Sequence, residues 1–231
     1  MEEVFDSITM GIIYKLYGKK VIRDMKGVVS AGKEARVYWA KGWEGRDLAV
    51  KIYLVSTSDF RKSIRRYIEG DPRFESIPES NFRLLIYEWA KKEFRNLKRM
   101  REAGVRVPEP IAVMGNVLVM AFLGEEGYRA PLLYESDENL EHMYEELMRQ
   151  LRLMVCEAEL VHADLSEYNV MVWRGEPWII DVSQAVELSH PRALEFLERD
   201  IENLSLFFSR KLGVGLPQEL RGELEACARR A

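Results

Sequence analysis

The segment that most constrains what this chain folds into covers residues 160–181 and reads LVHADLSEYNVMVWRGEPWIID. Two short apolar runs flank Gly175-Glu176-Pro177, which predicts a β-hairpin that turns at those three residues. The predicted strands are 170–173 and 178–180. Asn169 precedes the first strand and Asp181 follows the second, so a hairpin brings their side-chain oxygens together. Asp164 lies in the polar loop before them. The segment therefore predicts a phosphoryl-transfer site.

Each of these three polar residues has a chemical role to fill. Asp164 can accept the proton of an attacking hydroxyl or align that nucleophile, and Asn169 and Asp181 offer the oxygen ligands that Mg²⁺ prefers. The alternative for each residue alone is a helix cap or a turn, which is common for Asp and Asn in loops. The spacing of all three favours catalysis. We interpret His162 as a structural residue that bonds the loop backbone, because no orienting partner is identifiable for a catalytic histidine.

A lysine within an apolar strand is the next candidate. Lys51 stands in the run Leu48-Ala49-Val50-Lys51-Ile52-Tyr53, where a charge is costly unless it is paired. It either holds nucleotide phosphates while paired with a carboxylate of the following helix, or is an edge-strand lysine with its head in solvent. Glu88 and Glu93 are the candidate carboxylates. Glu93 begins a Glu-Phe-x-x-Leu pattern that would aim it at the lysine, but the sequence leaves the choice open.

The turn between the first two predicted strands is the place for a phosphate-binding loop. It reads Ser30-Ala31-Gly32-Lys33-Glu34-Ala35. Only Gly32 lacks a Cβ, so the pattern is weaker than a loop with three glycines. Ser30 and Lys33 can compensate through side-chain contacts with phosphate oxygens. A simple hairpin turn is the alternative.

The spacing of apolar residues along the chain predicts a mixed α+β fold. A polar stretch at 56–80 is the best candidate for a mobile insertion. We expect an N-terminal lobe at 1–123, with an antiparallel sheet and one long helix, and a small, mostly helical catalytic lobe at 124–231. The predicted helices are 4–17, 82–103, 137–158 and a segment from 191 onward, and the predicted strands of the first lobe lie within 28–55 and at 111–114 and 117–122.

Composition narrows the partners. A net charge of −4 gives no broad basic field that would draw the chain to nucleic acid or to a membrane. Local contact with RNA stays open, because residues 91–101 hold six basic residues and one acid. An acidic amino terminus and the lack of a long apolar run predict a cytoplasmic protein without a membrane partner. Cys156 and Cys227 lack neighbours at metal spacing, and we interpret both as plain thiols, with neither a disulfide nor a zinc site.

Beyond these residue patterns, the chain resembles the RIO family of atypical serine/threonine protein kinases, in particular its subtype-one branch, over nearly all of residues 25–210. The last two of the segments that carry the resemblance are highly specific. The segments are SAGKEARVY at 30–38, AVKIY at 49–53, KEFRNLKRM at 92–100, VRVPEP at 105–110, LVHADLSEYN at 160–169 and IIDVSQAVELSHPRALEFLERD at 179–200.

This resemblance implies a magnesium-dependent kinase and ATPase, with Mn²⁺ as a substitute metal. It places Lys51 on the phosphates of ATP, Asp164 as the catalytic acceptor, and Asn169 and Asp181 on the metal. The adenine pocket would have Met120 as its guard and backbone contacts from Ala121 and Leu123. It also implies that Asp181 receives the phosphoryl group as an aspartyl-phosphate. The biological role that it implies is to assist maturation of the small ribosomal subunit, in contact with the subunit precursor and its RNA. The protein substrate is not identified by the sequence.

Departures from ordinary protein kinases agree with the resemblance. Val182-Ser183 replaces the usual Phe-Gly after the metal aspartate, and about 50 residues follow Asp181, too few for an activation segment with peptide-docking helices. The 27 residues before the first loop are too few for the winged helix of the family's other main branch, so we expect no DNA partner. Ala121 stands where an acidic residue is expected after the guarding methionine.

Two other functions compete with this one. A nucleotide-gated assembly switch would use ATP binding to set a conformation, with little kinase activity. Small-molecule kinases of the aminoglycoside or choline type share the His-x-Asp-x-x-x-x-Asn pattern and the later aspartate, but need further helices to build an acceptor pocket.

Overall fold

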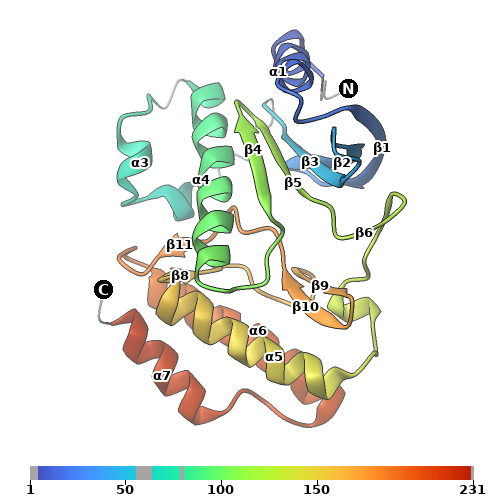
Figure 1. Ribbon diagram of the computed structural model, residues 1–231. Helices are drawn as coiled ribbons and strands as arrows, with labels where there is room; N and C mark the ends of the chain where they lie inside the picture. Colours follow the sequence, from blue (N-terminus) through green and yellow to red (C-terminus); the bar gives the residue numbers. More distant parts are fainter. Residues whose placement is uncertain (1–4, 56–63, 79–80, 230–231) are drawn as a thin grey trace. The chain divides into compact units, whose positions relative to one another are not determined.

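The computed structural model describes residues 5–55, 64–78 and 81–229. The chain divides into two compact units. The first comprises Met1–Arg95 and Pro108–Arg129, and the second comprises Asn96–Val107 and Ala130–Ala231. The five-stranded sheet belongs to the first unit, and the three C-terminal helices belong to the second (Figure 1). The predicted α+β class is therefore confirmed.

A five-stranded antiparallel sheet forms the first unit. Its strand order is β1-β2-β3-β5-β4, and every neighbouring pair is antiparallel. Helix α1 contacts the sheet, and its N-cap Asp6 accepts a hydrogen bond from the Thr9 amide at 2.7 Å. Apolar side chains of α1 and of strands β3 and β5 form the core of this unit. The elements are α1 Ser7–Gly18, β1 Asp24–Ala31, β2 Ala35–Lys41, β3 Asp47–Tyr53, β4 Pro110–Met114 and β5 Val117–Ala121.

The long helix α4 covers Phe82–Glu102. Trp89 on this helix is fully buried and lies against the rings of Tyr67 and Phe74 from the segment before it. That segment includes the short helix α3, Pro72–Glu75. Part of the expected mobile insertion therefore packs on α4, while its residues 56–63 and 79–80 lie outside the described residues.

Helices dominate the second unit, where α5, α6 and α7 pack on one another (Figure 1). Helix α5 begins at Leu140 rather than at 137, and a π-helical turn, η2, extends it. Helix α6 is capped at its C-terminal end by Gly213, which adopts the left-handed conformation that glycine favours. The elements are the 3-10 turn η1 Leu133–Glu135, α5 Leu140–Arg152, η2 Leu153–Glu157, α6 Ala193–Leu212 and α7 Gln218–Ala228.

Short hairpins and strand pairs complete the fold. The predicted hairpin forms as β9, Val170–Trp173, with β10, Glu176–Ile179, but its turn was predicted wrongly. Glu176 pairs with Trp173, so the turn is Arg174-Gly175, with φ of 54° and 75°. Two positive φ values match the two-residue turn that suits the twist of a hairpin. The other pairs are β6 Gly124–Glu125 with β7 Tyr128–Arg129, and β8 Leu160–Val161 with β11 Val186–Glu187.

The two cysteines correct a second expectation. Cys156 in η2 and Cys227 in α7 form a disulfide, with their Cα atoms 5.3 Å apart. Packing of α7 on η2 brings together residues that are 71 positions apart, which a search for nearby metal-spaced cysteines cannot detect. The interpretation as plain thiols was wrong. Within the described ranges, no helix is long and apolar enough to cross a membrane.

Candidate active site

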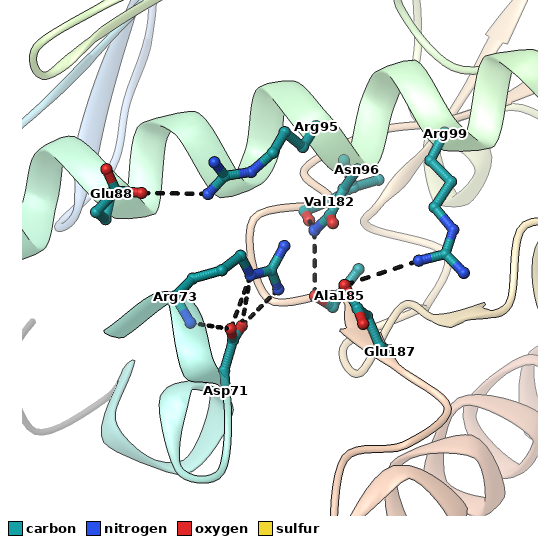
Figure 2. Close-up of polar contacts among 9 residues, drawn as sticks. All are labelled: Asp71, Arg73, Glu88, Arg95, Asn96, Arg99, Val182, Ala185 and Glu187. Carbon is teal, nitrogen blue, oxygen red and sulfur yellow. Dashed lines mark hydrogen bonds and ion pairs between the residues drawn. The ribbon is translucent and has the colours of Figure 1, made fainter. Parts of the chain in front are cut away.

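In the first unit, Lys51 is buried and paired. Its Nζ lies 2.8 Å from Oε1 of Glu93, and the two side chains are only 8% and 1% exposed. Glu88 instead accepts a hydrogen bond from Lys91 at 2.6 Å. It accepts another from Arg95 at 3.2 Å, which Figure 2 shows. The choice left open by the sequence is therefore settled for Glu93. A buried ion pair of this kind holds a cation in a fixed place at the cost of desolvating both groups.

Tyr53 is a member of this cluster that the sequence did not single out. It lies two residues after Lys51 in β3, and so its side chain is on the same face of the strand. The Tyr53 hydroxyl donates to Oε2 of Glu93, while Lys51 bonds the other oxygen. The lysine Nζ also lies 5.1 Å from the centre of the Tyr53 ring. The carboxylate is thus held at both oxygens.

The predicted phosphate loop lies at the tip of the β1–β2 hairpin. Ser30, Gly32 and Lys33 are all exposed there. The Gly32 amide donates to the Ala35 carbonyl at 3.0 Å, which closes the turn. A Cβ added at Gly32 would lie 3.3 Å from that carbonyl oxygen, so the close approach of the backbone is the local reason for a glycine.

The predicted adenine-binding residues lie at the end of β5. Met120 pairs with Ala49 of β3, and Leu123 is buried. The Ala121 amide donates to the Glu109 carbonyl at 2.8 Å. The Ala121 amide is therefore already bonded within the protein. The backbone atom of Ala121 that a base could contact is its carbonyl oxygen.

In the second unit, one loop holds Asp164 and Asn169. The Asn169 amide nitrogen donates to the Asp164 carbonyl at 2.8 Å and lies 3.4 Å from the Asp164 carboxylate. Burial raises the pKa of Asp164, and the negative charge of Asp181 raises it further. The structure therefore places Asp164 next to Asn169 and close enough to Asp181 for the two charges to interact.

The backbone around this set is unusual. Asp181 has a φ of 56° and Ala163 has a φ of 67°. Both values lie in the left-handed region, which residues other than glycine rarely adopt. The Ser183 hydroxyl donates to Oδ1 of Asp181 at 3.1 Å. His162 is fully buried, with its Nε2 3.0 Å from the Ile180 carbonyl. As expected, that histidine contacts backbone, and it does so at the residue before Asp181.

Asp200 of α6 holds both sides of the catalytic loop. Its two carboxylate oxygens accept hydrogen bonds from the amides of Ala163 and Leu165, each at 2.8 Å. Asn203 of the same helix donates to the Leu165 carbonyl at 3.0 Å. Asp200 is fully buried, and burial raises its pKa to about 7. Because Asp164 lies between the two bonded amides, Asp200 positions it. The Leu-Glu-Arg-Asp sequence at 197–200 offers no local signal of this role.

Asn96 holds the chain after Asp181 in a similar way. Its side-chain nitrogen donates to the carbonyls of Val182, at 2.9 Å, and Ala185, at 3.1 Å, as Figure 2 shows. The Asn96 side chain is buried. Sequence reasoning missed it, because an asparagine inside an amphipathic helix reads as a neutral helix residue.

Asn169 and Asp181 are residue types that can hold magnesium. Within the described ranges, no group of three His, Cys, Asp or Glu side chains is arranged to hold a metal ion. Asn169 and Asp181 together supply amide and carboxylate oxygens, and the Asn169 nitrogen is already engaged with Asp164. Mg²⁺ is typically bound by one or two carboxylates and keeps several waters. The two residues are therefore a suitable partial set.

A solved structure resembles this fold. The Rio2 kinase of Chaetomium thermophilum, in an ADP/Mg²⁺-phosphoaspartate complex, aligns with a TM-score of 0.66 over 95% of this chain and 74% of its own, at 20% identity. The chain therefore shares the fold of this Rio2 kinase.

Sequence comparisons give the family. The RIO domain matches residues 36–219. The RIO-type serine/threonine-protein kinase Rio1 of Haloferax volcanii is 48% identical over 211 residues, which are 91% of this chain and 72% of that protein. Serine/threonine-protein kinase RIO1 of Caenorhabditis elegans is 47% identical over 218 residues, 93% of this chain but only 42% of that protein. The chain belongs to the RIO family, and it spans less than half the length of the C. elegans relative.

Proposed function

We propose that the protein is a RIO-type serine/threonine protein kinase and ATPase of the subtype-one branch that uses ATP with magnesium. The observation that carries this proposal is the arrangement of Asp164, Asn169 and Asp181 on one loop and hairpin. Asp200 holds this loop through hydrogen bonds to the backbone on either side of Asp164. The curated relatives at 47% and 48% identity are named serine/threonine-protein kinases, and this supports the assignment of the reaction.

Nucleotide binding falls to residues of the first unit. Lys51, held by Glu93, carries a positive charge at a defined position and suits the phosphates of ATP. The exposed turn of Ser30, Gly32 and Lys33 offers a hydroxyl, a backbone amide and an ammonium to the same phosphates. Adenine would lie against Met120 and read the backbone of Ala121 and Leu123.

Proton handling falls to Asp164. A raised pKa makes this carboxylate a better proton acceptor than an exposed aspartate. It would take the proton of a serine hydroxyl or of a water molecule as the γ-phosphoryl group is transferred. Asn169 and Asp181 would hold Mg²⁺, with Mn²⁺ as a substitute, and the metal supplies neutralising charge to the phosphates.

Asp181 also has a second role in this proposal. One of its oxygens would attack the γ-phosphorus of ATP, so that the bond to the β-phosphate oxygen breaks, an acyl phosphate forms and ADP leaves. Water or a serine hydroxyl then takes the phosphoryl group and restores the carboxylate. The phosphoaspartate in the Rio2 kinase of C. thermophilum supports this route, and the strained backbone at Asp181 is typical of a functional position.

The partners are proposed from the family resemblance. We infer a cytoplasmic protein that acts on a precursor of the small ribosomal subunit and contacts its RNA, with a protein substrate still to be identified. The basic run at 91–101 supports RNA contact less than its composition indicates. Lys92 is buried over the Trp89 ring at 4.8 Å, and Arg99 pairs with Glu159 at 2.6 Å.

Labelling with γ-phosphate-labelled ATP and Mg²⁺ tests the chemistry. Free phosphate, phosphoserine and hydroxylamine-sensitive acyl phosphate are measured separately. We expect Asp181→Asn to abolish turnover and the acyl phosphate. We expect Asp164→Asn to slow transfer to serine by about 100-fold or more while ATP binding stays within a few-fold.

The matched control is Glu198→Gln, which removes an exposed carboxylate of α6 and should change none of these products. Unchanged acyl-phosphate labelling in Asp181→Asn would reject its role as acceptor. Loss of ATP binding in Asp164→Asn would make that residue structural. Free phosphate without phosphoserine from the wild-type protein would favour the nucleotide-gated switch.

A further inference from the structure

The rings of two exposed tyrosines contact each other in the second unit. The ring centres of Tyr134 in η1 and Tyr168 are 4.8 Å apart, with the ring planes inclined by 44°. The two residues are 44% and 58% exposed. Tyrosine is enriched at interfaces, because its ring offers apolar surface while its hydroxyl can stay in contact with water.

The backbone fixes this pair beside the catalytic loop. The Tyr134 amide donates to the Glu167 carbonyl at 3.4 Å, and the Val172 amide donates to the Pro131 carbonyl at 2.8 Å. The segment at 131–134 is therefore bonded to the loop and to β9. Tyr168 is therefore next in sequence to Asn169, whose amide contacts Asp164, and the Tyr134 ring lies against the Tyr168 ring.

The segments that carry the rings are acidic, although Lys211 lies next to Asp137 and the charge of Arg199 acts on Asp164. Residues 133–139 and 164–169 contain five acids and no Lys or Arg. Two of these acids have local partners. Asp137 pairs with Lys211 at 2.7 Å, and Glu135 accepts from the Leu132 amide at 2.8 Å and the Tyr134 hydroxyl at 3.0 Å. Glu138 is exposed and Glu167 is half-buried, and no ion pair is seen for either within the described part of the chain.

Aromatic faces bordered by carboxylates suit one kind of ligand group. A guanidinium or ammonium is attracted to the face of a tyrosine, and a nearby carboxylate adds to that attraction. A nucleic-acid strand would also stack on the rings, but its phosphates would be repelled by the acids. The charge therefore favours a basic polypeptide over RNA.

We propose that the Tyr134–Tyr168 pair is a docking site for the acceptor polypeptide, and that it binds an arginine or lysine lying close in sequence to the acceptor serine. This inference rests on the proposed kinase function and deepens it by naming a substrate class. Tyr168 and Tyr134 then act as specificity-determining residues, because they select the polypeptide by its cation and bring its serine toward Asp164.

Binding of matched peptides tests the surface without relying on turnover. Two labelled peptides, each with one serine, differ only in that two arginines near the serine are replaced by alanine, and fluorescence anisotropy measures their affinity for the full chain. We expect the arginine peptide to bind the wild-type protein at least about fivefold more tightly, the gain of two exposed cation–π contacts. Tyr134→Ala with Tyr168→Ala should remove that difference.

Three variants serve as controls. Tyr134→Phe with Tyr168→Phe keeps both rings and should retain the preference. Glu167→Gln should weaken binding of the arginine peptide alone. Tyr14→Ala removes an exposed ring of α1 that is 67% exposed and should leave the preference unchanged. Equal binding of the two peptides to the wild-type protein would overturn the proposal. A preference that survives in the double alanine variant would also overturn it. So would a labelled oligo-uridine that binds the wild-type protein more tightly than the arginine peptide does.

A kinetic measurement separates this inference from the function on which it rests. With the arginine peptide as the acceptor, the double alanine variant should show a higher KM at a similar kcat, because the rings act in binding. Charge-selective binding without any phosphoryl transfer would reject the kinase function and retain the surface. Phosphoryl transfer without charge-selective binding would reject the surface and retain the function.

Discussion

Tyr53 illustrates how a single hydroxyl fixes a charged pair. Glu93 is bonded by Lys51 at one oxygen and by Tyr53 at the other, with both the carboxylate and the tyrosine buried. Without the hydroxyl, the carboxylate would keep the lysine but lose its second anchor and could rotate. The position of Lys51, and with it the proposed phosphate contact, therefore depends on a residue that does not itself touch the phosphate.

Tyr53→Phe should weaken both the fold and the binding of ATP. The lost hydrogen bond ends on a charged group, so unfolding by urea should show a loss of about 2 kcal/mol. Affinity for a fluorescent ATP analogue should fall several-fold, because Lys51 is less well oriented. Tyr17→Phe is the matched control, since it removes a hydroxyl that accepts from the Met25 amide at 3.0 Å. The control should lose stability without losing affinity. Equal ATP affinity in the wild type and Tyr53→Phe would contradict the positioning role.

The sequence was sufficient to propose the catalytic residues, whereas the residues that hold them in place could not be identified from it. Asp164, Asn169 and Asp181 occur within eighteen residues, and Lys51 is conspicuous among apolar neighbours. Asp200 and Asn96 act through hydrogen bonds to backbone groups that lie 35 to 89 positions away. Such bonds depend on how α6 and α4 pack, and no local pattern encodes them.

At the scale of elements, strong periodicity predicted the structure well and short elements escaped it. The helix expected at 82–103 is observed as Phe82–Glu102. The hairpin formed, but Pro177 was assigned to the turn, whereas it lies in β10 opposite Val172. A proline is tolerated there because β10 is an edge strand of a two-stranded sheet. The pair of β8 and β11 has two residues in each strand, too few to show an alternating pattern.

The disulfide between η2 and α7 leads to a prediction about the second unit. It closes a loop across 71 positions and so restricts the unfolded chain. Reduction should lower the free energy of unfolding by about 2–4 kcal/mol, measured by urea titration with and without dithiothreitol. Cys156→Ser with Cys227→Ser should match the reduced protein and show no further response to the reductant. Detection of two free thiols in the native, unreduced protein would contradict the bond.

The charge of the whole molecule bears on the proposed contact with RNA, because most cations of the basic run on α4 lie next to an acid. The net charge is −4, and on α4 both Lys91 and Arg95 pair with Glu88. Lys98 is 64% exposed and lies 3.8 Å from Glu102, the longest ion-pair distance on this helix. Arg101 is also exposed. Any contact of α4 with RNA phosphates therefore falls mainly to Lys98 and Arg101.

Lys98→Glu with Arg101→Glu should weaken the proposed association with small-subunit particles by about tenfold and flatten its salt dependence. Each phosphate contact that is lost reduces the slope of log affinity against log salt by about 0.7–0.9, so two contacts should reduce it by about 1.5. Sedimentation with purified particles at several salt concentrations measures both quantities. The matched control is Lys15→Glu with Lys19→Glu, which makes the same change in net charge. Lys15 is an exposed residue of α1, and Lys19 is the exposed residue that follows the helix. Equal losses of affinity in the two double variants would mean that only the net charge matters. Unchanged affinity in both variants would mean that α4 does not contact the RNA.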